Sequence, residues 1–482
     1  MPAPDLKHRV LHAIGWSSVA KLSAQMINWV VTLIVITKLS PEDYGLMAIA
    51  SAIIGAFITL SSVGLGDGLK QLPELSETVL RQVFAINLGA TALFLALICA
   101  AAFPVAILYE ESRLVPIILA ISLNLVFIGM YMIPRALLER KLELKRAMVV
   151  EVFSSVCASL TTLAMAFAGF GVWSLVAGYL VHNFSNMVGY NLIEPFLKLP
   201  QFRISQDTKR ITNFGFLRTL EQIAWYLYAS ADVFIIGKLV GPVALGYYHV
   251  AKTLAQLPLS KSAPILNIVA FSAFSLAQRE DARVGEYFIK AIRVLSLLSF
   301  PVFFGLSAIA PQLLDYILGD TWAEAILPMQ IIALATAFMM VGLIVGPYLQ
   351  GTGHVRHSLR NALFGLVLFP TIIVIGCYWG IVGASIAWSI AQPIFFLQNI
   401  LRAARVTGIS MKDLLGAMAV PCLTATVMYG IVRLTVMYLP TDLPEFFVLA
   451  VAILAGAASY FLGLAILQRG AYRELRTLLG RA

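Results

Sequence analysis

Two stripes of polar residues, about 200 residues apart in the chain, could bind a charged ligand. The first stripe has spacings of three and four residues and comprises Ser18, Lys21, Gln25, Asn28 and Thr32. The second has the same spacings and comprises Arg218, Glu221, Trp225, Tyr228 and Asp232. Residues three and four apart share one helix face, so each set predicts a helix with one polar side. Because a charged group in lipid costs about 2.5–3.5 kcal/mol on insertion scales, both stripes must face protein or water.

The basic residues in these segments predict recognition of an anion. Arg and Lys bind phosphate groups through charge-assisted hydrogen bonds, and an aromatic ring such as that of Trp225 suits the apolar face of a sugar. A third segment has His249, Lys252, Gln256 and Ser260 at helical spacing, and Lys261 follows between two prolines that obscure its direction. The predicted substrate-binding set is Lys21, Gln25, Arg218, Trp225, Lys252 and Lys261.

The charged residues also admit other interpretations. Arg218 and Glu221 are three apart and could pair with each other, and Lys21 could extend towards the membrane surface. Asp232 and Glu221 are candidates for binding a coupling ion, although Asp232 could equally form a structural hydrogen bond or pair with a lysine. His182 stands alone in its apolar segment and is interpreted as a packing residue rather than a proton relay.

The elements that position these residues are transmembrane helices. Only 12% of the 482 residues are charged and 60% are hydrophobic, which is too little charge for the surface of a soluble protein. A membrane span needs about 20 apolar residues, and this criterion predicts an all-α polytopic protein of about fourteen spans. They lie near 14–37, 44–66, 83–107, 115–134, 147–168, 172–193, 211–237, 244–275, 291–313, 325–350, 359–379, 382–401, 414–438 and 446–467.

Basic residues are unevenly distributed between the connections. Most Lys and Arg residues lie in alternate connections and at both ends of the chain, whereas the opposite connections hold only Lys38, Arg113 and Lys238. The positive-inside rule then predicts cytoplasmic termini in a bacterial inner membrane. The four cysteines show no metal-binding or paired spacing, and we expect no metal, no cofactor and no catalytic residue.

The chain also resembles itself. Thr37–Pro41 matches Gly237–Pro242, and Gly169–Gly178 matches Trp379–Trp388. This repeat predicts two related six-helix lobes at 1–196 and 205–404, followed at 410–482 by two extra helices and a cytoplasmic tail. Parallel repeats are a transporter architecture that holds substrate between the halves, so the two polar stripes are expected to line one shared cavity.

Several short motifs, in this order, resemble the polysaccharide-transporter (oligosaccharide flippase, Wzx-type) branch of the superfamily shared with multidrug and toxic-compound extruders. They are Pro134–Lys141, Gly171–Gly178, Ala231–Lys238, Phe300–Pro301 and Leu318–Trp322. The resemblance covers roughly 10–470, and of the site residues only Asp232 lies in a matched motif. It implies alternating access and an undecaprenyl-diphosphate-linked oligosaccharide flipped to the periplasmic leaflet for exopolysaccharide, capsule or lipopolysaccharide synthesis. Implied partners are membrane lipids, a polysaccharide polymerase and export machinery, but no nucleic acid.

Three other functions are possible for a chain of this kind. A cation-coupled multidrug extruder would share the fold, but the spans hold more bases than acids, which favours an anionic substrate. A membrane-embedded glycan-assembly enzyme is disfavoured because the sequence has no DxD, paired-His or phosphate-binding glycine motif. A scaffold that transports nothing would have no reason to keep charges in lipid.

Overall fold

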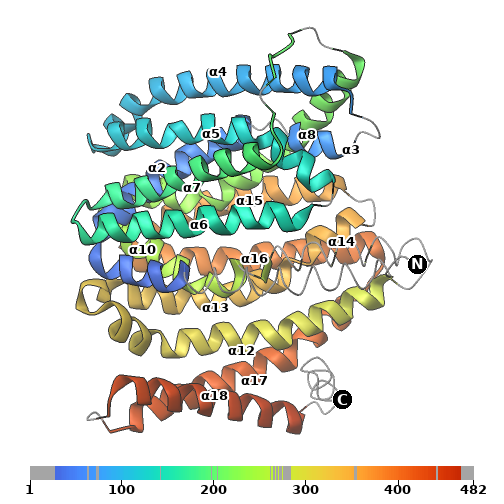
Figure 1. Cartoon of the computed structure of the whole chain (residues 1–482). Helices are drawn as coiled ribbons and strands as arrows, with labels where there is room; N and C mark the ends of the chain where they lie inside the picture. The colour runs from blue at the N-terminus through green and yellow to red at the C-terminus, as the bar shows by residue number, and fades with distance from the viewer. Residues whose placement is uncertain are drawn as a thin grey trace, which may run out of the picture. The chain divides into compact units, whose positions relative to one another are not determined.

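The computed structural model is built of helices throughout the part that it describes (Figure 1). Ten of the helices are long and apolar enough to cross a membrane, which confirms the prediction of an all-α polytopic membrane protein. The count of about fourteen spans stays a prediction. The structure describes residues 28–467 except 62–64, 72–74, 142, 197, 203–204, 352–354, 441–442 and all but scattered residues of 261–283.

The chain divides into two compact units, Met1–Val243 and Ala244–Ala482. Unit 1 contains the helical segment Asn28–Lys38 and then α2 (Pro41–Ser61), α3 (Leu65–Gln71), α4 (Glu77–Tyr109), α5 (Leu114–Arg140), α6 (Leu144–Phe167), α7 (Val172–Ile193), α8 (Gln206–Ala229) and α9 (Ala231–Leu239). From the boundary onward follow α10 (Pro242–Ala255), α12 (Val284–Leu318), the 3-10 helix η1 (Asp320–Ala325), α13 (Ile326–Gly342), α14 (Val345–Gly351), α15 (Val355–Cys377), α16 (Gly380–Thr407), α17 (Met411–Tyr438) and α18 (Glu445–Leu467).

Two charge-free stretches, 152–193 and 361–401, are long enough to predict helical hairpins with turns at Gly169–Gly171 and Trp379–Gly380, and both hairpins form there. Between α6 and α7, Gly169 and Gly171 have φ values of 80° and 53°, and Gly380, where α16 begins, has φ of 66°. These backbone angles are strained for residues with a Cβ and open to glycine. The turns are therefore determined locally, which explains why they could be predicted.

Two predicted spans are interrupted. The span at 211–237 divides at Ser230 into α8 and α9. The span at 325–350 breaks after α13, at Leu343. Pro347 has no N–H to bond the Leu343 carbonyl, which gives a local cause for the second break. The segment around Leu343 then continues as the short helix α14.

A proline inside α5 makes that helix depend on a neighbour. Pro134 cannot donate to the Met130 carbonyl, as a residue at that place in a helix normally would. Asn191 of α7 supplies the missing donor, with its Nδ2 at 3.2 Å from the Met130 oxygen. In a bilayer no water can replace that bond, so the pairing of α5 with α7 is fixed at this level.

The long helix α12 repeats this arrangement twice. Its two internal prolines free the carbonyls four residues earlier, and side chains of neighbouring helices donate to both. On α18, the Tyr460 hydroxyl lies 3.0 Å from the Leu297 oxygen, freed by Pro301; on α13, Gln330 Nε2 lies 3.3 Å from the Ser307 oxygen, freed by Pro311. Both neighbours thereby become part of the hydrogen bonding of α12.

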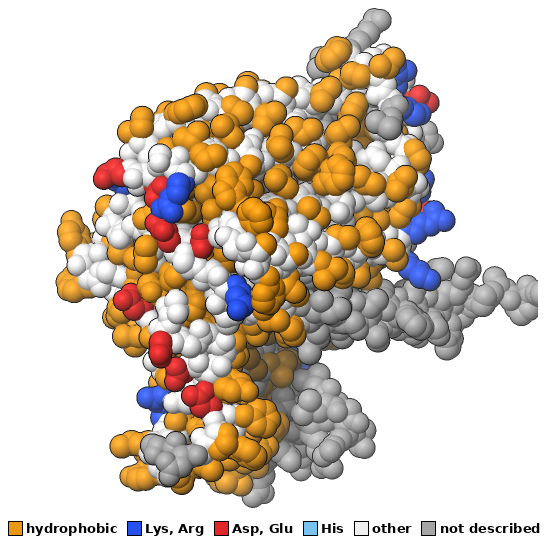
Figure 2. Space-filling view, turned by 60° about the vertical axis from the view of Figure 1, so that its left-hand side comes forward, with side chains coloured by type: hydrophobic (Ala, Val, Ile, Leu, Met, Phe, Trp, Pro, Cys, Tyr) orange, Lys and Arg blue, Asp and Glu red, His pale blue; other side chains and the backbone are white. Residues whose placement is uncertain are grey.

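The core of unit 2 lies around α12, which packs against α13, α17 and α18. Phe288 is fully buried and stacks on Tyr348 with ring centroids 4.0 Å apart. Large apolar side chains also cover the outside: Ile107, Leu192 and Met437 are each more than three-quarters exposed. Figure 2 shows a broad area of hydrophobic side chains without charge, beside which Lys, Arg, Asp and Glu gather. Such a surface suits lipid and not water.

Candidate functional site

The structure describes only part of the predicted binding set. Lys21, Gln25 and Lys261 lie outside the described residues. Arg218 and Glu221 belong to α8, but their side chains are also outside the description. The prediction that these groups line one cavity with the remaining members stays a prediction.

Lys252 is held against an aromatic ring within unit 2. Its Nζ lies 5.6 Å from the centroid of the Trp388 ring on α16. The Lys252 side chain is half-buried, whereas Trp388 is only 3% exposed. A cation over an aromatic face is stabilised by about 0.5–2 kcal/mol, more when water is excluded. Trp388 therefore allows a positive charge to persist inside an apolar helix bundle.

Nothing in the sequence pattern singles out Trp388 for this role. In the internal repeat it corresponds to Gly178 of α7, where a Cβ would meet Thr162 Oγ1 at 1.9 Å. The two halves thus differ at this position: one has close helix contact and the other has a ring that contacts a lysine. That difference in residue size is the feature of the sequence that could have indicated the role of Trp388.

Trp225 and Tyr228 lie on one side of α8, as their spacing predicts. Their rings meet edge to face with centroids 6.0 Å apart. Trp225 is 53% exposed in the described part of the chain. An exposed ring fixed by a second ring is a suitable platform for a sugar face.

Asp232 is buried at the beginning of α9, with 1% of its surface exposed. Its Oδ1 accepts a hydrogen bond from the Val233 backbone N–H at 2.9 Å. The first turn of a helix favours negative charge, because its N–H groups point toward it. This environment suits a structural carboxylate and equally one that binds an ion, so both interpretations stay open.

The segment α8–α9 begins the second sequence repeat, yet it packs within unit 1. The Tyr226 hydroxyl donates to the Ala52 carbonyl of α2 at 3.0 Å. Gly55, one turn along α2, makes this approach possible, because a Cβ there would lie 2.1 Å from the Tyr226 oxygen. Side-chain size at Gly55 therefore determines how closely α8 can approach α2.

Three contacts join α9 to α2 and the end of α4. The Tyr109 hydroxyl donates to the Phe234 carbonyl at 3.2 Å, and Lys238 Nζ lies 2.9 Å from Glu110 Oε1. Gly237 fits between Ile49 and Tyr109, where an added Cβ would be 3.1 Å from either side chain. These contacts close the unit at the helix ends that the charge distribution predicts to be periplasmic.

A network of charged groups lies nearby at the start of α5. The Arg113 guanidinium donates to both Glu111 and Glu42. The hydrogen bond from Arg113 is the main reason that the pKa of Glu111 lies below its ordinary value. Asp43, next to Glu42 on α2, accepts from the Val172 N–H at 2.8 Å and so caps α7.

A second polar network crosses α5, α6 and α7 at their opposite ends. Arg135 of α5 bonds Glu139 at 2.9 Å and lies 3.5 Å from Glu151 of α6. Tyr190 of α7 places its hydroxyl 3.4 Å from Glu151 and stacks its ring on that of Tyr131. In the sequence, Arg135 is one of a run of basic residues that by itself predicts only an anchor at the cytoplasmic surface. The signal that it missed is the spacing of four on α7 from His182 through Asn186 to Tyr190.

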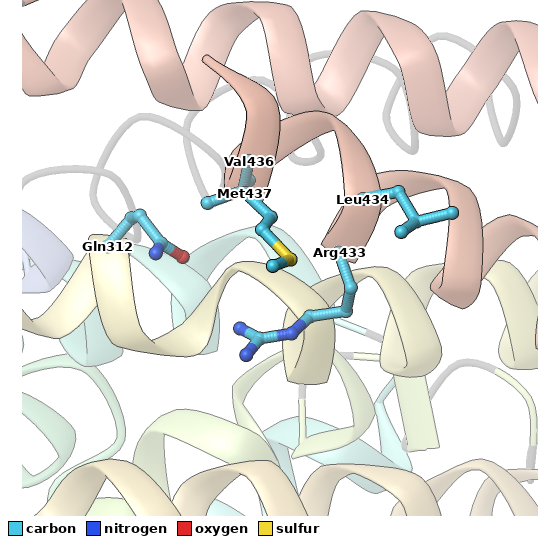
Figure 3. Close-up of a pocket in the computed structure, with 5 residues that line it drawn as sticks. All are labelled: Gln312, Arg433, Leu434, Val436 and Met437. Atoms are coloured by element: carbon cyan, nitrogen blue, oxygen red, sulfur yellow. The ribbon is translucent and has the colours of Figure 1, made fainter. Parts of the chain in front are cut away.

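A cavity of about 350 Å³ lies between α12 and α17 in unit 2. Figure 3 shows Arg433 and Met437 reaching from α17 beside Gln312 of α12. Arg433 Nη1 donates to the Ala308 carbonyl at 3.4 Å. The other lining residues, Leu434 and Val436, are apolar, and none of the five belongs to the predicted site.

The described residues contain no group of three or more His, Cys, Asp or Glu side chains arranged to hold a metal ion. The four cysteines are free thiols within helices.

Comparison with known proteins identifies the family. A family model described as "Polysaccharide biosynthesis protein" matches residues 38–327. The lipopolysaccharide biosynthesis protein WzxC of Escherichia coli is 23% identical over 81% of this chain and 80% of its own. The succinoglycan biosynthesis transport protein ExoT of Rhizobium meliloti is 25% identical over 79% of this chain and 76% of its own.

The fold also matches a solved structure. The lipid II flippase MurJ, in an inward closed conformation, superposes with a TM-score of 0.75 at 16% identity, over 95% of this chain and 99% of its own. At that identity the likeness concerns the fold alone.

Proposed function

This chain belongs to the polysaccharide biosynthesis protein family, in the superfamily that polysaccharide flippases share with multidrug and toxic-compound extruders, and from that premise we propose that it flips an undecaprenyl-diphosphate-linked oligosaccharide. The family and the apolar helices make it a multi-pass protein of the bacterial inner membrane. Its relatives are transporters and flippases, not enzymes. The substrate moves from the cytoplasmic to the periplasmic leaflet, and both termini are cytoplasmic.

The observation that carries this proposal is the lysine held inside unit 2. The half-buried Lys252 lies within an apolar bundle, with its Nζ over the Trp388 ring. A basic residue among apolar helices is costly and is retained where it serves a function. A diphosphate that crosses the membrane needs such a cation, because its own charge must be neutralised on the way. Cationic drugs, the substrates expected of an extruder, would favour acids instead.

The remaining members of the predicted set complete the proposed site. Lys21, Arg218 and Lys261 bind the diphosphate together with Lys252. Trp225 carries a sugar ring on its exposed face, as its edge-to-face contact with Tyr228 supports, and Gln25 bonds sugar hydroxyls. Asp232 and Glu221 are the candidates for a coupling ion. A polymerase and export machinery receive the product in exopolysaccharide, capsule or lipopolysaccharide synthesis.

Alternating access is the proposed mechanism, with the sequence-repeat lobes 1–196 and 205–404 as its moving parts. Within unit 1, the contacts of α9 with α2 and α4 lie at the helix ends predicted to be periplasmic. Opening on that side would separate Lys238 from Glu110 and withdraw Tyr109 from the Phe234 carbonyl. The binding site would then become accessible from the periplasmic leaflet instead of the cytoplasmic leaflet.

The test is transbilayer movement of a fluorescent undecaprenyl-diphosphate oligosaccharide in liposomes that contain the purified protein. Loss of one charge-assisted hydrogen bond of about 1.5–3 kcal/mol predicts a rate roughly 10–100-fold lower in Lys21→Ala, Arg218→Ala or Lys252→Ala. Lys290→Ala is the matched control, since Lys290 is exposed at the beginning of α12, and it should keep the wild-type rate.

The outcomes separate the function from the site. Movement that survives all three substitutions would keep the flippase and reject the cationic site. Folded wild-type protein that moves no lipid-linked oligosaccharide, but expels cationic dyes under a proton or sodium gradient, would favour the multidrug extruder.

A further inference from the structure

Two buried side-chain oxygen atoms in the middle of unit 1 have no hydrogen-bond partner among the described residues. Asn186 of α7 is 2% exposed, and its Oδ1 accepts no hydrogen bond from any described residue. Ser154 of α6 is fully buried, and its Oγ is likewise unpaired among the residues that the structure describes. Folded proteins seldom leave such atoms unsatisfied. The Asn186 oxygen can only accept, so its lack of a partner in a membrane helix pair indicates a missing proton donor.

The helix register places both groups next to His182. Between α6 and α7, Tyr190 contacts Glu151, and Gly178 lies against Thr162. Antiparallel continuation of this pairing sets Ser154 level with His182 and Asn186. His182 lies about 15 Å from either end of α7, by the rise per residue. The histidine is therefore close to mid-membrane.

The side chain of Asn186 already contacts the imidazole. Its Nδ2 lies 3.2 Å from His182 Nε2, so in the neutral ring Nε2 accepts a hydrogen bond. A protonated ring has a donor on both nitrogens. Rotation of the Asn186 amide then presents Oδ1 to Nε2–H and turns Nδ2 away, while the ring also bonds the Ser154 backbone. Protonation of His182 would thus use the unpaired Asn186 Oδ1.

A counter-charge lies on the neighbouring helix. Glu151 interacts electrostatically with the His182 ring, and Arg135 acts on it with the opposite sign. The Glu151 carboxylate is itself oriented by Tyr190 and by Arg135. A carboxylate near an imidazole favours the charged ring, so the cluster can stabilise a proton at this depth.

The other ionisable groups of the packed helices complete the electrostatic setting. From α5 these are Tyr131, Arg135 and Glu139; from α6, Glu151; from α7 itself, Tyr179 and Tyr190; and from α2, Asp43 at the far end of α7. Tyrosines remain neutral near pH 7, so Glu151 and Arg135 are the charges whose opposite effects meet at His182, while burial itself disfavours the charged ring.

We propose that His182 is a proton-binding site of unit 1, with Glu151 as its counter-charge and Asn186 as the group that reorients. The site is separate from Asp232 and Glu221. Its coupling to transport, with a proton moving through unit 1 as the lipid-linked substrate crosses, rests on the proposed function. Binding of the proton itself does not.

The first test measures the proton directly, without substrate. Full-length protein with ¹⁵N-labelled histidine is titrated in lipid nanodiscs, and the His182 signal is assigned by its loss in His182→Gln. We expect the His182 signal to shift with pH as the ring binds a proton. In Glu151→Gln the titration midpoint should fall by about one pH unit, because the counter-charge is gone.

The matched control for Glu151→Gln is Glu194→Gln, which removes a carboxylate at the end of α7 whose partner is Lys141. It should leave the midpoint unchanged. If His182→Gln does not fold, the signal is assigned by elimination, with substitutions at the other histidines. A ring that stays neutral throughout, or equal shifts in the two glutamate variants, would overturn the proposal.

The second test adds transport. Liposomes that move lipid-linked oligosaccharide should do so faster under one direction of an imposed pH gradient, and His182→Gln should abolish this difference while keeping movement at equal pH. His357→Gln, on α15, serves as the histidine control. A gradient effect that is intact in His182→Gln rejects the coupling. Titration of His182 without any substrate movement leaves the proton site standing and rejects the proposed function.

Discussion

Lys238 Nζ lies 2.9 Å from Glu110 Oε1, and this ion pair joins α9 to the residue that follows α4. The Glu110 side chain is 82% exposed, so the pair contributes little to stability. Glu110 is also the only described non-glycine residue with a positive φ, at 57°. Glu110 thus adopts an unfavourable backbone angle and pairs with Lys238. By sequence, the helix that contains Lys238 belongs to the other repeat.

Covalent closure of this pair should stop transport. In a variant whose four native cysteines are replaced, Lys238→Cys with Glu110→Cys is treated with a short bifunctional thiol reagent. We expect movement of the lipid-linked oligosaccharide to fall at least tenfold, and a cleavable reagent should allow its recovery. Lys141→Cys with Glu194→Cys joins a comparable pair, 2.6 Å apart, between α5 and α7. Transport that continues through the closed Lys238–Glu110 link would contradict the proposed opening.

Gly55→Ala should destabilise the packing of α8 on α2. Its Cβ would collide with the Tyr226 hydroxyl at 2.1 Å, and such overpacking costs about 1–3 kcal/mol. The melting temperature in nanodiscs measures the loss. Gly89→Ala on α4 is the control, because a Cβ there meets nothing within 4 Å. Combining Gly55→Ala with Tyr226→Leu shortens the opposing side chain and should recover part of the lost stability. Equal melting temperatures of Gly55→Ala and Gly89→Ala would refute the contact.

Tyr460→Phe should leave the Leu297 carbonyl unpaired inside unit 2. The expected loss of stability is about 1–3 kcal/mol, the cost of a buried acceptor without a donor. Pro301→Ala restores an N–H to the helix, so the same Tyr460→Phe change should then have a smaller effect. Tyr438→Phe, at an 80% exposed position of α17, controls for loss of a hydroxyl. An effect of Tyr460→Phe that is the same with and without Pro301 would exclude this explanation.

The Glu111–Arg113 pair predicts a pH dependence outside the membrane. The hydrogen bond from Arg113 lowers the pKa of Glu111 below its ordinary 4.5. A carboxyl with a lowered pKa stabilises the folded state above its unfolded pKa, and that contribution disappears as the pH falls through the folded pKa. The difference in stability between wild type and Glu111→Gln should therefore be constant at neutral pH, below about 1 kcal/mol, and vanish in acid. Melting between pH 7 and pH 3 checks this, and a difference that grows in acid would have the wrong sign.

The features that could be predicted from the sequence depend on neighbours along the chain. The span limits follow from local hydropathy, and the reversals at Gly169–Gly171 and Gly380 follow from backbone freedom at glycine. The break at Leu343 has a local cause as well. Pro347 lacks the N–H that would bond the Leu343 carbonyl, and hydropathy alone does not register it. These features need no knowledge of the partner helix.

The features that were missed depend on which helices meet. The Lys252–Trp388 contact joins residues far apart in the sequence, on α10 and α16. The network around His182 consists largely of neutral groups, such as Asn186 and Tyr190, whose spacing along α7 resembles ordinary packing. Its chemistry emerges only when Glu151 of α6 lies opposite. The role of α9 could not be predicted either. The sequence repeat places α9 in the second half, whereas its contacts are with α2 and α4 of the first.

The proline arrangement in α12 has a consequence for how the protein is made. During synthesis α12 precedes α18. The donor to the Leu297 oxygen, the Tyr460 hydroxyl, is translated more than a hundred and fifty residues later. Until Tyr460 is inserted, α12 holds a carbonyl that lipid cannot satisfy. The hydrogen bonding of α12 is therefore complete only when α18, the last helix of the described chain, is in place.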